Sequence, residues 1–131
     1  MNPRRPRILL LDSDERNLIE LQGELEDSGF DTTITWDGAE ALQWLRARPF
    51  EILLIGDHPP ELTASEILHE VQCSRMRVQC VILQRQRRPQ PLPSDHFLSL
   101  GAQGVIESTS PAEVAQLLQE LLVPQGATAR A

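Results

Sequence analysis

The chain has 131 residues, of which 40% are hydrophobic and 24% charged, and a formal net charge of −7. This length supports one domain with a sizeable core, and the apolar runs are far shorter than a membrane crossing requires. The negative charge argues against nucleic-acid binding by the domain as a whole.

The basic N-terminus and the two cysteines bear on localisation. The apolar segment at 8–11 is followed at once by acidic residues, so it does not have the pattern of a secretory signal. Cys73 and Cys80 lack the spacing of metal-binding or redox motifs. We therefore interpret them as reduced thiols of a cytoplasmic protein, with Cys80 buried.

Five short segments have the composition of β-strands, at residues 7–11, 31–35, 51–55, 78–83 and 104–106. The first, third and fourth contain continuous hydrophobic runs rather than an alternating pattern. Such runs are typical of strands buried on both faces of a parallel sheet.

Helical patterns separate these strands. The first carries Leu18, Leu21 and Leu25 on one face, with Asp14 as its predicted N-cap and Gly29 at its end. Later helices are predicted to begin at Asp37 and Thr63, each followed by Glu in a capping box, near residue 94, and at Ser110-Pro111. The prolines of segment 84–93 limit the helix near residue 94 to about residues 94–100.

Alternating strands and helices with short connections predict a doubly wound α/β fold with helices on both faces of the sheet. We expect a single domain over residues 1–123 and a flexible tail over 124–131.

In such a sheet, ligands bind at the carboxyl ends of the strands. The residues at these ends are Asp12-Ser13-Asp14, Trp36-Asp37-Gly38, Gly56-Asp57-His58, Gln84-Arg85 and Glu107-Ser108-Thr109. No glycine-rich phosphate loop follows the first strand, and no serine elbow or paired histidine is present. A dinucleotide-binding, hydrolytic or metalloenzyme site is therefore not expected.

Several segments resemble the response-regulator receiver family of two-component signalling. They are ILLLDSDERNLIELQGELEDSGF, WDGAEALQWL, FEILLIGDHPP and GAQGVIESTSPAEVAQLLQELL, and together they span roughly residues 7–122. The resemblance is most specific in the acids after the first strand, in DGAEAL and at Pro60. It implies a flavodoxin-like (βα)5 three-layer sandwich with a five-stranded parallel sheet in the order 2-1-3-4-5.

The family transfers a phosphoryl group from a phosphohistidine to an aspartate. The resemblance implies that two acids after the first strand hold Mg²⁺ together with the acceptor, while a hydroxyl residue and a lysine contact the phosphoryl oxygens. In this chain the two acid positions fall on Asp12 and Ser13, and the acceptor position falls on Gly56. The position of the hydroxyl residue falls on Gln84 and that of the lysine on Ser108. Only Asp12 matches the family pattern.

Glycine has no carboxylate to phosphorylate, and Ser13 is a poor magnesium ligand. We therefore interpret the chain as a pseudo-receiver that is not an enzyme, contains only the relic of a phosphorylation pocket, and needs no cofactor. Its expected role is a phosphorylation-independent interaction or regulatory module in two-component or phosphorelay signalling.

Two alternatives stay open. The first is a working phosphoreceiver that uses Asp57 as a shifted acceptor fed by a histidine kinase, with Mg²⁺ held by Asp12, Asp14 and Asp57. Alternation along a strand opposes this, because a shift of one residue turns a side chain to the other face. The second alternative is an N-terminal regulatory domain cut from a longer transcription regulator.

Candidate partner-binding residues are Arg85, Arg87 and Arg88, in the segment that departs most from the family, and Trp36 at the rim of the site. The expected partners are signalling proteins, and the last helix offers a face for a homodimer. No membrane partner is expected, and nucleic acid is not favoured. The three histidines, including His69, have no partner nearby in the sequence and receive no role.

Overall fold

The computed structural model describes residues 5–56, 63–84, 94–107 and 110–122. The strands are β1 (Arg7–Leu11), β2 (Asp31–Thr35), β3 (Ile52–Ile55), β4 (Gln79–Gln84) and β5 (Gly104–Glu107). The helices are α1 (Glu15–Asp27), α2 (Gly38–Ala47), α3 (Ala64–Cys73), α4 (Ser94–Ser99) and α5 (Pro111–Leu122). Every predicted strand is present, with boundaries within one residue of those predicted.

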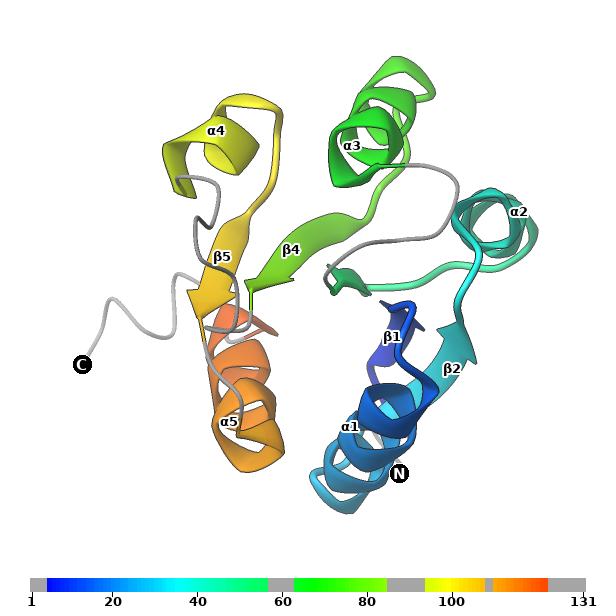
Figure 1. Ribbon diagram of the computed structural model, residues 1–131. Helices are drawn as coiled ribbons and strands as arrows, with labels where there is room; N and C mark the ends of the chain where they lie inside the picture. Colours follow the sequence, from blue (N-terminus) through cyan, green and yellow to red (C-terminus); the bar gives the residue numbers. More distant parts are fainter. Residues whose placement is uncertain (1–4, 57–62, 85–93, 108–109, 123–131) are drawn as a thin grey trace.

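All strand pairs are parallel, and their order is β2-β1-β3-β4-β5, as the resemblance implied. Helices α1 and α5 cover one face of the sheet, while α2, α3 and α4 cover the other (Figure 1). The predicted flavodoxin-like three-layer architecture is thereby confirmed.

The pleat of the strands divides the core into two layers. On β1, Ile8 and Leu10 pack with α1 and α5, whereas Leu9 and Leu11 pack with α2, α3 and α4. This alternation explains the continuous hydrophobic runs, because every residue of a strand covered on both faces is buried. Cys80 of β4 belongs to the second layer, which confirms its predicted burial.

Most of the predicted helix caps are observed. Asp14 accepts hydrogen bonds from the amides of Arg16 and Asn17 at the start of α1. Thr63 and Glu66 form the complete capping box of α3. Each pairing satisfies backbone donors that a helix N-terminus leaves without an intrahelical partner.

The capping box predicted for α2 forms only in part. Asp37 accepts from the amide of Ala39, but Glu40 does not bond back to the N-cap amide. Instead, the Thr35 hydroxyl donates to a carboxylate oxygen of Glu40, and the Asp37 amide donates to the Thr35 oxygen at 3.3 Å. A buried threonine at the end of β2 thus takes the place of the expected reciprocal bond.

Candidate functional site

The candidate site lies at the carboxyl end of the sheet, where β1 and β3 run side by side. Leu11 pairs with Ile55, the last residue of β3, so Asp12 and Gly56 directly follow the two adjacent strands. The amide of Gly56 donates to the Leu11 carbonyl at 2.6 Å, and the amide of Asp12 donates to the Thr35 carbonyl at 3.3 Å. These backbone bonds fix both residues against the end of the sheet.

The side chain of Asp12 is turned toward Gly56. A Cβ atom added to Gly56 would lie 2.1 Å from Asp12 Oδ2 and 2.7 Å from Asp12 Cγ. Real Cβ atoms do not approach neighbours so closely, so the Asp12 carboxylate occupies the space next to the Gly56 Cα where any larger residue would begin. Asp12 is only 2% exposed.

The backbone of Asp14, the N-cap residue of α1, also holds the Asp12 carboxylate in place. The amide of Asp14 donates to Asp12 Oδ1 at 2.9 Å, a charge-assisted hydrogen bond. The Asp14 carboxylate itself is exposed; it caps α1 and accepts from the Asn17 side-chain amide at 2.9 Å. Asp12 and Asp14 therefore have different roles and do not form one acidic pair.

Of the remaining positions of the implied phosphoryl pocket, Gln84 is buried, Ser13 is exposed and Ser108 is not described. Gln84 is the last residue of β4, is 4% exposed and pairs in register with Glu107 of β5. Ser13 is exposed at the start of the loop that leads into α1. Ser108 and Asp57 lie outside the described residues, so the predictions that involve them stay predictions.

Of the three positions implied to hold magnesium, 12, 13 and 56, only position 12 carries an acid. No group of three or more His, Cys, Asp or Glu side chains in the described ranges is arranged to hold a metal ion. Mg²⁺ takes oxygen ligands in near-octahedral geometry, and the Asp12 carboxylate lies against Gly56, the position of the implied acceptor.

The candidate partner-binding residues are placed only in part. Trp36, which follows β2, is 52% exposed, as the hypothesis of a partner anchor requires. Trp44 instead packs against the core layer of α2, α3 and α4. The centroid of its ring lies 5.6 Å from the guanidinium carbon of Arg48. Arg85, Arg87 and Arg88 lie outside the described residues. None of the helices in the described ranges has the length and apolar composition of a membrane crossing.

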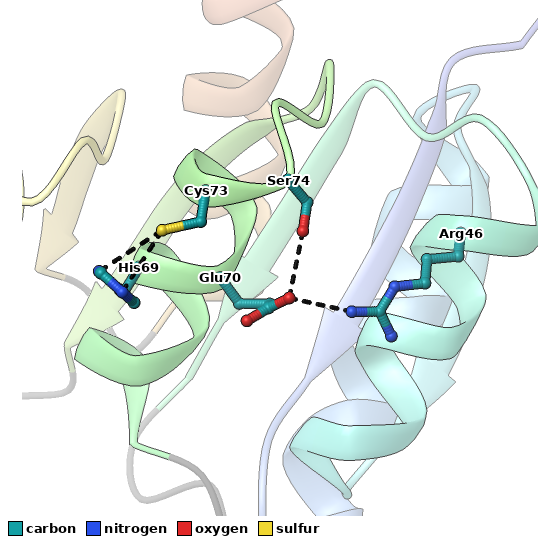
Figure 2. A network of polar contacts seen from close by, with 5 residues as sticks. All are labelled: Arg46, His69, Glu70, Cys73 and Ser74. Carbon is teal, nitrogen blue, oxygen red and sulfur yellow. Dashed lines mark hydrogen bonds and ion pairs between the residues drawn. The ribbon is translucent and has the colours of Figure 1, made fainter.

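One pair of side chains was missed in the sequence. His69 and Cys73 lie four residues apart on the exposed face of α3, and Cys73 Sγ is 3.4 Å from His69 Nε2 (Figure 2). The interpretation that His69 has no partner nearby in the sequence was therefore wrong. The signal was the spacing itself, since residues four apart on a helix are neighbours.

Solved structures that this chain resembles include receiver domains of response regulators. The chemotaxis response regulator CheY4 of Vibrio cholerae matches with a TM-score of 0.80 and 20% identity, over 91% of this chain and all of that chain. The chain has the fold of receiver domains. The receiver domain of the Francisella response regulator 1452 matches with a TM-score of 0.79 and 21% identity, over 89% of this chain and 96% of that chain.

A third structure with the receiver fold is HP1043, an orphan response regulator of H. pylori. It matches with a TM-score of 0.79 and 16% identity, over 92% of this chain and all of that chain. No family model and no curated protein matches the sequence. The likeness therefore lies in the fold, which is retained at low sequence identity.

Proposed function

We propose that this chain is a pseudo-receiver: a non-enzymatic interaction or regulatory module of a two-component or phosphorelay system that acts without phosphorylation. The observation that carries the proposal is the contact between Asp12 and Gly56. The position expected to hold the acceptor aspartate is a glycine, and the neighbouring carboxylate fills the space in which an acceptor side chain would start.

Two further features support the absence of phosphoryl chemistry. Gln84, in the place of the family's hydroxyl residue, is buried and has no hydroxyl group. Asp14, the second acid of the shifted-site alternative, is committed to capping α1 through Arg16 and Asn17. Recruiting Asp14 as a metal ligand would cost the cap, which typically stabilises a helix by about 1 kcal/mol.

A module that does not switch by phosphorylation acts through a constant surface. We propose that the partner is a signalling protein that binds the face of α4, β5 and α5, or segment 84–93 with its arginines. Leu98 of α4 is 45% exposed, and the face also offers α5 for self-association. Trp36 provides a second exposed apolar anchor.

Phosphorylation is the decisive test. Intact mass is measured after incubation with acetyl phosphate and Mg²⁺, and amide NMR shifts are followed during addition of Mg²⁺ and then of beryllium fluoride, a phosphoryl mimic. We expect no added phosphoryl mass and no saturable shifts around Asp12 and Asp14. A receiver with an acceptor aspartate, treated in the same way, controls for the reagents.

The alternative outcomes are distinct. A phosphoryl mass that disappears in Asp57→Asn would refute the proposal and establish a working receiver with a shifted acceptor, fed by a histidine kinase. The full reading frame tests the remaining alternative: a DNA-reading domain encoded after this chain would make it the regulatory domain of a transcription regulator.

A further inference from the structure

A pair of metal-ligating side chains lies on α3, on the side of the sheet opposite α1 and α5. His69 and Cys73 are both exposed, and Figure 2 shows the sulfur of Cys73 turned toward the imidazole of His69. Imidazole nitrogen and thiolate sulfur are the two ligands that tetrahedral zinc sites use most. We propose that His69 and Cys73 bind Zn²⁺ and that a second copy of this chain completes the site with the same two residues.

The two side chains meet on the surface of α3, which brings both ligand atoms within reach of one zinc ion once the imidazole turns. Bond lengths of about 2.3 Å to sulfur and about 2.0 Å to nitrogen place these atoms about 3.5 Å apart in a tetrahedral complex. Cys73 Sγ lies 3.4 Å from His69 Nε2 and 4.0 Å from Nδ1. The sulfur therefore lies beside the ring and not in line with a nitrogen lone pair, so zinc binding requires the imidazole to turn about its Cβ–Cγ bond. An exposed side chain makes such a turn within nanoseconds.

The nearby carboxylates are engaged in other contacts. Glu70 Oε2 lies 3.0 Å from Arg46 Nη2 of α2 and accepts from the Ser74 hydroxyl at 3.1 Å (Figure 2). Glu66 completes the capping box with Thr63. In the described part of the chain, His69 and Cys73 therefore belong to no group of three metal ligands.

Two ligands per chain determine the stoichiometry. A structural zinc site uses four protein ligands, and two copies related by a two-fold axis supply two cysteines and two histidines. The site is reachable, because His69 and Cys73 are both exposed on the surface of α3. Cys73 is the last residue of α3, where the negative end of the helix dipole favours a bound cation.

This inference is independent of the proposed pseudo-receiver function, since the pair lies outside the Asp12–Gly56 site. The test measures molar mass by light scattering during size-exclusion chromatography, with a phosphine reductant present to exclude a disulfide-linked dimer. Zn²⁺ is added at increasing ratios to the chain and then removed with a chelator. We expect the mass to double at one Zn²⁺ per two chains and to return to its starting value with the chelator.

Variants and a spectroscopic probe identify the ligands. His69→Ala and Cys73→Ser should each abolish the zinc-dependent doubling, whereas Gln72→Ala, an exposed substitution on the same helix, should retain it. Co²⁺ in place of Zn²⁺ should give the absorption of a tetrahedral thiolate complex in the wild-type chain and in Gln72→Ala, but not in Cys73→Ser.

Three results would overturn the inference. The first is an unchanged mass at excess Zn²⁺. The second is zinc-dependent doubling that persists in Cys73→Ser or His69→Ala. The third is a thiolate–Co²⁺ absorption with no change in mass, which would mean that a single chain and solvent complete the coordination.

Discussion

The contact between Gly56 and Asp12 can be tested through stability, because two opposite effects act on the substitution Gly56→Ala. Replacing glycine by alanine stabilises a protein by about 0.4–1 kcal/mol where the backbone allows it, since the unfolded chain loses freedom. Gly56 does not have a positive φ, so its backbone accepts alanine. The new Cβ, however, would lie 2.1 Å from Asp12 Oδ2 and 2.7 Å from Asp12 Cγ.

The steric effect should win. Forcing an extra methyl group into a packed site costs about 1–3 kcal/mol, and Asp12 has little room to move because it is buried and its Oδ1 accepts from the Asp14 amide. We expect Gly56→Ala to lower the free energy of unfolding by about 1–2 kcal/mol. Urea unfolding followed by tryptophan fluorescence and far-UV circular dichroism measures this change, provided that the urea dependence (m value) is the same in both proteins.

A double-mutant cycle with Asp12→Ala identifies the contact. Removing the carboxylate should make Gly56→Ala nearly neutral, giving a coupling energy of about 1–2 kcal/mol between the two positions. Gly23→Ala is the matched control: Gly23 lies inside α1, a Cβ there would meet no atom within 4 Å, and the substitution should stabilise by about 0.5–1 kcal/mol. Additive effects of Gly56→Ala and Asp12→Ala, or a stable Gly56→Ala, would refute the reasoning.

Three other predictions concern stability and chemistry elsewhere. Thr63→Ala removes the capping box of α3 and should cost about 1 kcal/mol in urea unfolding, whereas Ser110→Gly, which keeps a tolerated N-cap residue at α5, should cost only a few tenths. Burial raises the pKa of the Cys80 thiol from 9.0 to about 12, so the unfolded chain loses this proton first as the pH rises. The stability from Cys80 is therefore fully present below pH 9.0 and should fall above it by about 1.4 kcal/mol per pH unit. The chain has no lysine and no tyrosine whose titration would obscure this slope. Adding Cys80→Val to a Cys73→Ser variant should abolish the pH dependence of stability above pH 9.0. The same slope in the single and the double variant would contradict the assignment to Cys80. Trp36→Ala should leave the free energy of unfolding in urea within about 0.5 kcal/mol of the wild type, because Trp36 is 52% exposed; a larger loss would mean that Trp36 contributes to the fold.

Local sequence signals specify the strands and helices of this protein and the faces that they bury. The hydrophobic runs of β1, β3 and β4, the leucines of α1 and the caps at Asp14 and Thr63 are signals between residues close together in the chain. Local backbone geometry converts such signals directly into structure. For this reason the strand and helix boundaries, the burial of Cys80 and the helix caps could be predicted, apart from the capping box of α2. That exception arose because Glu40 bonds to Thr35, a buried residue on the preceding strand.

The position of the Asp12 carboxylate could not be predicted from the sequence, because it depends on how distant segments pack. The sequence identified Gly56 as a position without an acceptor, but the placement of Asp12 depends on the register of Leu11 with Ile55 and on the backbone of the loop into α1. Strand register and side-chain rotamers are set by packing between distant segments, which no local pattern encodes. The same holds for the ion pair that ties Glu70 to Arg46 of α2 and turns it away from the His69–Cys73 pair.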